Sequence, residues 1–183
     1  MKIRRILFPF LFLTLIITLG GCLVYQTIEY RLTLNRDGKS GSILIQSSNI
    51  GSSALDTAKQ DEDFSELVSN WKEDKYLLSR MDDGVYLKQR SLMLKNGVLV
   101  WKESGIFDDI QKLKDGVSYE DTTRITVGKD QTVVSTNGAM VITKDSTVVF
   151  WPPHTRDFRI KIQQRNFEPT SRFAEKFRLL RKK

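Results

Sequence analysis

An uncharged apolar segment near the N-terminus sets the strongest limit on what this chain can fold into. Lys2, Arg4 and Arg5 precede residues 6–19, which carry no charged side chain. This run of 14 residues is shorter than the ~20 that a membrane-spanning helix needs. A basic start followed by a short apolar core is typical of a secretory signal peptide. We therefore expect the folded domain to begin only after this segment.

The apolar run ends in the motif Leu19-Gly20-Gly21-Cys22. This motif resembles the lipobox of bacterial lipoproteins, in which a small residue before the cysteine lets a dedicated peptidase bind the extended chain. The resemblance implies cleavage before Cys22, lipidation of that residue with acyl chains such as palmitate, and anchorage in a membrane of the cell envelope. An ordinary signal peptide with a chance cysteine, or an uncleaved anchor, is the alternative.

Cys22 is the only cysteine in the chain, which excludes an intrachain disulfide and a multi-cysteine metal site. A lone thiol exported to an oxidising compartment is a liability unless it is modified. Acyl chains contribute about 0.8 kcal/mol per buried methylene, so a multiply acylated cysteine holds a domain at a membrane surface. Leu23 is not the aspartate that commonly retains lipoproteins at the inner membrane. In an organism with two membranes we therefore expect the outer membrane, with the domain facing the periplasm.

Length and charge favour one domain with basic ends. We expect a signal peptide at 1–21, a globular domain at 22–166 and a basic helix at 167–183. The formal net charge of the chain is +7, and removal of the three basic residues in the leader leaves +4. Residues 172–183 alone carry +5, so the high pI belongs to the leader and the tail. We therefore expect no nucleic acid among the partners of the domain.

Alternating apolar and polar residues predict a β-rich domain. Residues 27–47 are expected to form a hairpin around the turn signal Asn35-Arg36-Asp37-Gly38, followed by a polar loop at 47–53. A second hairpin is predicted at 85–102, where Asn96-Gly97 suits a tight turn with positive φ at both residues. Short β patterns that predict a meander follow at 122–127, 131–136, 139–143, 147–151 and 158–163.

One amphipathic helix is expected to pack on a face of this sheet. Its predicted start is Asp63, with Glu66 three residues later as in a capping box. Apolar residues then recur at helical spacing, and they are Phe64, Leu67, Val68 and Trp71. Core packing is the expected use of this stripe, and the alternative is that it faces a ligand cavity.

Three segments of the later strands have a characteristic spacing. They are Thr136-Asn137-Gly138, the turn Lys144-Asp145-Ser146 and the strand Val148 to Trp151. Together with a hairpin directly after the lipobox, they resemble envelope lipoprotein domains of the LppM type. That resemblance implies a β-rich sheet that grips a helix, with an apolar interior suited to lipid-like ligands. The chain departs from the family because it has no second, longer helix before the tail.

The C-terminal residues 170–183 are predicted to form a basic amphipathic helix. Phe173, Phe177 and Leu180 recur at helical spacing on one side. On one reading this stripe packs on the domain and the basic residues are solvated. On the other the tail lies on anionic lipid, where each basic residue contributes about 1 kcal/mol. The candidates for this membrane contact are Arg172, Lys176, Arg178 and Arg181.

No group of residues predicts catalysis, a metal site or a cofactor. His154 is the only histidine and lies in an expected loop. The acidic stretches at 61–63, 82–83 and 108–109 adjoin expected helix starts and turns, which are ordinary structural positions for carboxylates. The glycines are scattered in turns and form no phosphate-binding loop. We therefore expect a protein that is not an enzyme.

The sequence thus predicts an α+β fold. We expect an antiparallel β-rich sheet of hairpins and a meander, one packing helix and a C-terminal amphipathic helix. The leading functional hypothesis is a membrane-anchored envelope lipoprotein whose domain binds a lipid or another apolar ligand. The alternative is a structural or assembly module that binds an envelope protein and has no ligand cavity.

Overall fold

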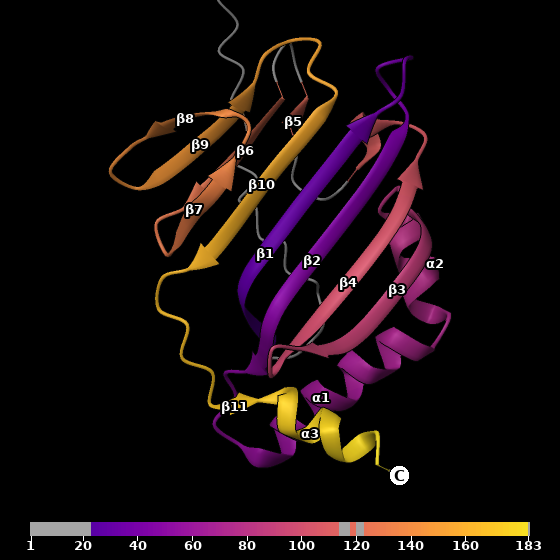
Figure 1. Cartoon of the computed structure of the whole chain (residues 1–183), viewed down its shortest axis with the longest axis vertical. Coiled ribbons are helices and arrows are strands. Elements are labelled where there is room, and N and C mark those ends of the chain that lie inside the picture. Colours follow the sequence, from indigo (N-terminus) through magenta and orange to yellow (C-terminus); the bar gives the residue numbers. More distant parts are fainter. Residues whose placement is uncertain (1–22, 114–117, 120–122, 183) are drawn as a thin grey trace, which may run out of the picture.

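The computed structural model describes residues 23–113, 118–119 and 123–182, which fold into two antiparallel sheets and three α-helices (Figure 1). The large sheet contains β1 (Leu23–Leu34), β2 (Gly41–Ser52), β3 (Tyr86–Lys95), β4 (Val98–Phe107), β7 (Gln131–Thr136), β10 (Asp157–Gln164) and the short β11 (Ser171–Arg172). The small sheet contains β5 (Ser118–Tyr119), β6 (Thr123–Gly128), β8 (Ala139–Ile142) and β9 (Ser146–Trp151). The helices are α1 (Thr57–Lys72), α2 (Lys75–Asp82), the 3₁₀ turn η1 (Ile110–Lys112) and α3 (Phe173–Leu180). The predicted α+β class and the C-terminal helix are confirmed.

The first hairpin forms the centre of the large sheet. The strand order is β3-β4-β2-β1-β10-β7, so β1 lies between β2 and β10. The predicted turn between β1 and β2 is confirmed, because the Asp37 carboxylate accepts hydrogen bonds from the backbone N–H groups of Lys39 and Ser40. These bonds and one from the Ser40 hydroxyl, the largest cause, lower the pKa of Asp37.

The prediction of a polar loop at 47–53 is wrong, because β2 continues to Ser52. Ser47 and Ser52 are both buried, although their side chains are polar. The Ser52 hydroxyl donates to a carboxylate oxygen of Asp63 at 2.5 Å, and Ser52 Oγ also accepts from the backbone of Ala54. A buried polar side chain is stable when it is hydrogen-bonded in this way. The strand is therefore held by partners that are remote in sequence.

The second predicted hairpin is confirmed as β3 and β4. Asn96 has φ of 52° and Gly97 of 79°, which is the left-handed conformation that a tight Asn-Gly turn requires. At the end of the hairpin away from this turn, β3 carries a bulge between Leu87 and Gln89. Bulges of this kind bend a strand and increase its twist.

The later strands form close to their predicted positions but are shared between the two sheets. β10 pairs with β1 and β7 pairs with β10, whereas β6 and β8 both pair with β9. In Figure 1 the small sheet and helices α1 and α2 lie behind the large sheet. One face of the large sheet is therefore covered. The later strands do not form a simple meander, because strands that follow each other in sequence, such as β6 and β7, belong to different sheets.

Two hydrophobic clusters fill the space behind the large sheet. The sandwich cluster, between the two sheets, consists of Ile28, Tyr30, Leu32, Ile43, Ile45, Val85, Phe107, Ile110, Leu113, Ile125, Val127, Val149, Trp151, Phe158, Ile160 and Ile162. The helix cluster, beneath α1 and α3, consists of Ile50, Leu67, Leu92, Leu99, Trp101, Phe173 and Phe177. Tyr25 packs against both clusters, and burial raises the pKa of its hydroxyl.

The packing helix begins earlier than predicted. Its N-cap is Asp56, whose side chain accepts from the backbone N–H of Ala58. Asp63, the predicted cap, lies inside α1 and is fully buried. The prediction was wrong because Asp63 is used as a hydrogen-bond partner of the core. α2 was not predicted. No helix in the described part of the chain is long and apolar enough to span a membrane.

Candidate functional site

The lipobox residues Leu19, Gly20, Gly21 and Cys22 lie outside the described residues. The described chain starts at Leu23, which is also the first residue of β1. Leu23 pairs with Ser52, and its side chain packs against the helix cluster. The residue next to Cys22 is therefore held at the end of the domain where α1 and α3 lie.

The predicted ligand-facing residues Phe64, Leu67, Val68 and Trp71 all pack in the helix cluster. The Phe64 ring meets the Phe173 ring edge-on, with 5.2 Å between their centroids. Trp71 meets Phe177 with the ring centroids 5.8 Å apart. Edge-on aromatic pairs of this kind are stable packing arrangements. The apolar face of α1 thus contacts α3, and its proposed contact with a ligand stays a prediction.

The basic residues of the tail are held in different ways. Lys176 forms an ion pair with Asp61 of α1 and lies over the Phe173 ring. Arg178 pairs with Glu175 one turn earlier. Arg172 belongs to β11, which pairs with β2, and Arg181 is the exposed C-cap of α3. The apolar side of α3 is buried, as the first reading of the tail predicts, while membrane contact by the basic side stays a prediction.

A buried ionic cluster joins α2 to the large sheet. Arg80 and Glu103 are only 6% and 4% exposed, and their side chains form an ion pair at 3.1 Å. The hydroxyl of Tyr76 and the indole N–H of Trp101 both donate to the other oxygen of Glu103. Arg80 also pairs with Asp83 at the end of α2. Because the Glu103 carboxylate contacts side chains of α2 and of its own strand, we interpret this cluster as structural.

Little in the residue pattern predicts this cluster. Glu103 lies in the polar run Lys102-Glu103-Ser104 of β4, so its burial can be predicted only if the face and register of the strand are known. Arg80 lies in a helix that was not predicted. Pairing of the two residues depends on the packing of α2 against β3, which no local pattern encodes.

The groups considered for catalysis are dispersed. His154 is exposed, with φ of 72° in the turn after β9. Asp157 binds Arg159, and this contact raises the pKa of the Arg159 guanidinium. Asp109 caps η1 by accepting from the backbone of Gln111. Among the described residues, no three His, Cys, Asp or Glu side chains come together in a way that could hold a metal ion.

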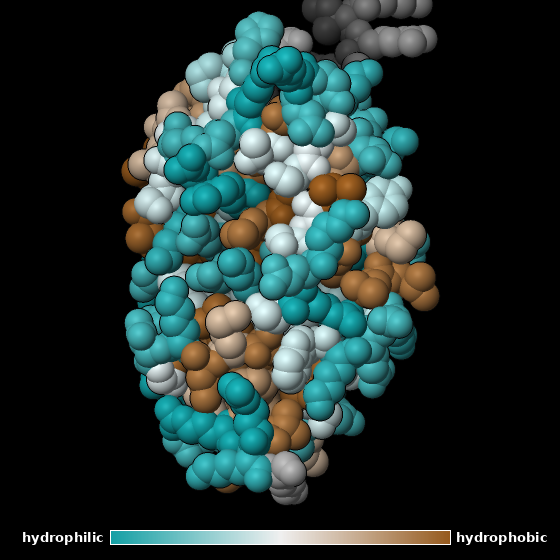
Figure 2. All heavy atoms as spheres, turned by 45° about the vertical axis from the view of Figure 1, so that its right-hand side comes forward, coloured by the Kyte–Doolittle hydropathy of each residue, from teal (hydrophilic) through white to brown (hydrophobic). Residues whose placement is uncertain are grey.

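The uncovered face of the large sheet is the candidate binding surface. In β1 the buried Ile28, Tyr30 and Leu32 alternate with side chains that point to this open face. No described helix or second sheet lies over its middle in Figure 1. Seen obliquely in Figure 2, the surface on the β3 side is mostly hydrophilic, with separate apolar groups between the polar ones. The side chains on the open face include the cations Arg31, Lys88, Lys95, Lys102, Arg159 and Lys161 and the acids Glu29 and Asp157.

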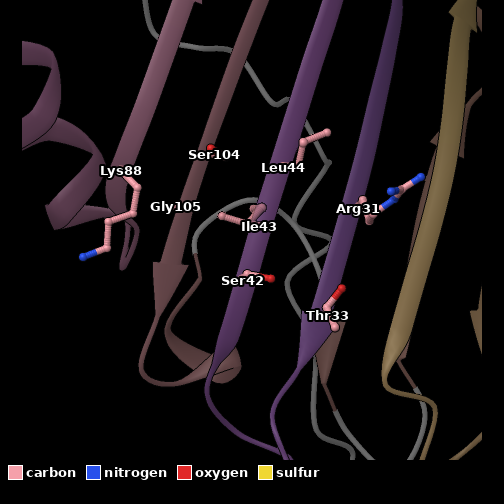
Figure 3. Close-up of a pocket in the computed structure, with 8 residues that line it drawn as sticks. All are labelled: Arg31, Thr33, Ser42, Ile43, Leu44, Lys88, Ser104 and Gly105. Atoms are coloured by element: carbon pink, nitrogen blue, oxygen red, sulfur yellow. The ribbon is translucent and has the colours of Figure 1, made fainter.

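A shallow depression of about 320 Å³ lies in this open face (Figure 3). Its floor includes Leu44, and the hydroxyls of Ser42, Thr33 and Ser104 surround it. Arg31 and Lys88 flank it on opposite sides, with their charged ends directed away from its centre. The depression therefore has hydroxyl groups at its rim and is open to solvent, and the two charged groups lie outside it. An open depression of this kind does not enclose an apolar chain as a lipid-binding cavity does.

Comparison with protein-family models, with curated proteins and with solved structures finds no match to this chain. The functional argument therefore rests on the residues and their arrangement.

Proposed function

We propose that this protein is a lipid-anchored lipoprotein of the bacterial cell envelope whose domain is a non-catalytic interaction module. Its open sheet face binds an acidic segment of another envelope component. The observation that carries this proposal is the uncovered face, on which cations outnumber acids. Opposite charges on two surfaces speed their encounter and select against wrong partners.

The packing of α1 favours an interaction module over a lipid-binding domain. The face of α1 that could have lined a cavity contacts Phe173 and Phe177. The depression in the open face is shallow and is bordered by hydroxyls and cations. An apolar ligand gains affinity by losing contact with water, and an open polar surface provides little of this gain.

The anchor is supported by the leader, the motif ending in Cys22 and the immediate start of β1. Mass spectrometry of the full chain extracted from membranes of its own host tests it. We expect the mature N-terminal peptide to begin with an acylated Cys22. The Cys22→Ser variant should keep its leader and lack acyl chains. An unmodified Cys22 or an intact leader in the unaltered protein would contradict the anchor.

Site-specific photo-crosslinking tests the binding face. A photoreactive residue at Ser42, which is exposed on the open face, should capture a partner in host membranes. The same residue at Thr126, exposed on the small sheet, is the matched control and should not capture it. Capture from Ser42 should fall with added salt and with Arg31→Glu, but not with Lys129→Glu at an exposed turn.

The outcome also separates the two functional hypotheses. If the yield of crosslinked partner is the same with added salt and in Arg31→Glu, the partner is not recognised through acidic groups. A lipid that co-purifies in addition to the anchor, and that crosslinks from Phe64 of α1, would favour the apolar-ligand hypothesis instead.

A further inference from the structure

We infer that β8 is a dimerisation edge, at which two copies of this chain pair their β8 strands antiparallel and join their small sheets into one. β8 is the last strand of the small sheet and pairs only with β9 among the described residues. It lies on the outer boundary of the molecule in Figure 1. Unpaired backbone groups along such an edge can accept another strand.

The side chains of β8 are unusually apolar for an exposed edge. Met140, Val141 and Ile142 are 49%, 51% and 75% exposed, and Ala139 is exposed beside them. The strand carries no charge and no proline. Natural sheets normally protect a free edge with lysine, proline, a bulge or a covering element. β8 has none of these within its residues.

The other edges of the two sheets are protected. β3 carries Lys88 and Lys95 with a bulge beside Lys88, and α2 packs against this strand. β7 pairs irregularly with β10, because the register shifts between Lys161 and Ile162. β5 is only two residues long. Because β8 is the one unprotected edge among the described strands, pairing ends at a dimer and does not continue into a filament.

The residues that lead into β8 are positioned by hydrogen bonds and by close packing. Asn137, just ahead of β8, accepts from the indole N–H of Trp151 at 2.8 Å and from the backbone N–H of Arg159 at 2.9 Å. Its amide also donates to the carbonyl of Asp157. At Gly138 a Cβ atom would lie 2.8 Å from the Trp151 ring, so the chain can pass there only as glycine. A preorganised edge binds without a further ordering cost.

Backbone alternation sets the register of the pair. The N–H of Thr143 donates to the carbonyl of Ser146 across the β8–β9 turn. Because donors alternate along a strand, the backbone groups of Met140 and Ile142 point to the open edge. A two-fold axis at Val141 lets Met140 of each copy exchange hydrogen bonds with Ile142 of the other. In this register the backbone N–H and C=O groups of Met140 and Ile142 all form hydrogen bonds with the second copy.

The flanking residues are compatible with this register. With Val141 opposite its own copy, Lys144 lies opposite Gly138 and Asp145 lies opposite Asn137. No like charges face each other, although opposed like charges would destabilise a strand pair. On one face of the joined sheet Val141 meets Val141 of the second copy, and on the other face Met140 meets Ile142. A second copy is therefore the occupant that fits this edge.

Disulfide trapping in membranes carrying the full chain tests the register. Residues opposite each other in a non-hydrogen-bonded antiparallel pair have Cα atoms about 4.5 Å apart, which suits a disulfide. Val141→Cys should give a disulfide-linked dimer of the chain under mild oxidation. Val134→Cys, equally exposed on β7, is the matched control and should stay monomeric. Equal crosslinking of the two variants, or a Val141→Cys adduct with a different protein, would overturn the proposal.

A charge substitution provides the second test. The unaltered chain in detergent should have twice the mass of one protein chain by light scattering. Val141→Lys should halve this mass, because two lysines then face each other across the axis. Val134→Lys should leave the dimer intact, and both variants should keep the circular dichroism spectrum of the folded chain. A monomeric unaltered chain, or a dimeric Val141→Lys variant, would overturn the proposal.

Discussion

The two hydrophobic clusters behind the large sheet are built on different principles. Most members of the sandwich cluster are aliphatic, and β1 and β10 each contribute every second residue to it. The helix cluster combines aliphatic side chains with aromatic pairs between α1 and α3, and it adjoins the ion pair of Arg80 with Glu103. The first therefore depends mainly on apolar burial. The second also depends on buried polar groups that find the right partners.

This difference indicates where a substitution should destabilise the fold most. Aliphatic cores tolerate substitution of similar volume with modest losses. A buried charge that loses its partner retains its desolvation cost and gains nothing in return. Polar substitutions near the helix cluster should therefore destabilise the domain more than those at the joint of the two sheets.

The largest expected effect is that of Glu103→Ala. It removes the carboxylate that binds Arg80, Tyr76 and Trp101. Breaking a buried pair in this way costs about 3–5 kcal/mol of the free energy of unfolding. Urea unfolding at neutral pH measures the loss. Glu29→Ala, on the open face of the same sheet, is the control and should change stability by less than about 0.5 kcal/mol.

Replacing both partners sharpens this test. In the Arg80→Met and Glu103→Leu double variant no unpaired charge stays buried, so we expect a loss well below the sum of the two single losses. A Glu103→Ala loss as small as that of Glu29→Ala would show that the helix cluster does not depend on its ion pair.

A smaller loss of stability is expected in the sandwich cluster between the two sheets. Asn137→Ala leaves the indole N–H of the buried Trp151 without its acceptor. An unsatisfied buried donor costs about 1–3 kcal/mol. Thermal and urea unfolding measure this loss, and Asn166→Ala in the exposed turn after β10 is the control. A loss larger than that of Glu103→Ala would reverse the contrast between the two clusters.

A still smaller effect is expected for the ion pair that links α3 to α1. Lys176→Ala removes the contact with Asp61, whose side chain is mostly exposed. Exposed pairs of this kind are worth about 0.2–1 kcal/mol. The difference from the unaltered chain should shrink with added salt. Lys129→Ala at an exposed turn is the control, and a salt-independent loss would mean that packing on Phe173 is what Lys176 contributes.

The smallest effect is local and depends on pH. The folded pKa of Asp37 lies below its ordinary value because Ser40 and two backbone N–H groups bind the carboxylate. A depressed pKa contributes stability above the unfolded value, which is lost as the pH falls through the folded one. Below about pH 4 the amide signals of Lys39 and Ser40 should therefore change together with protonation. In Asp37→Asn these signals should not titrate.

Patterns within one strand or turn predicted much of this fold. Both early hairpins, the Asn96-Gly97 turn and the apolar faces of α1 and α3 follow from residue spacing alone. These features are local, because each depends on neighbours within a few positions. The later strands were also placed well, but their sharing between two sheets was not foreseen. Strand order depends on contacts between residues far apart in sequence.

The errors share one physical cause. Ser52 and Asp63 look like loop and cap residues, yet they bind each other inside the domain. Glu103 lies between Lys102 and Ser104 and looks like a solvent-facing residue, yet its carboxylate binds Arg80. A polar side chain is buried only when a specific partner arrives from elsewhere, and a single sequence does not name that partner. For the same reason the open face could not be assigned before the covered face was known.

The position of β1 has a mechanical consequence. Leu23 starts a strand that is hydrogen-bonded to β2 on one side and to β10 on the other. Tension applied at this end of the chain runs along the strand axis, so it loads both antiparallel ladders in shear. Many hydrogen bonds then resist the load together, whereas a peripheral strand would peel off one bond at a time. If the chain is anchored through Cys22 as proposed, the domain can therefore transmit a pull from its attachment point before it unfolds.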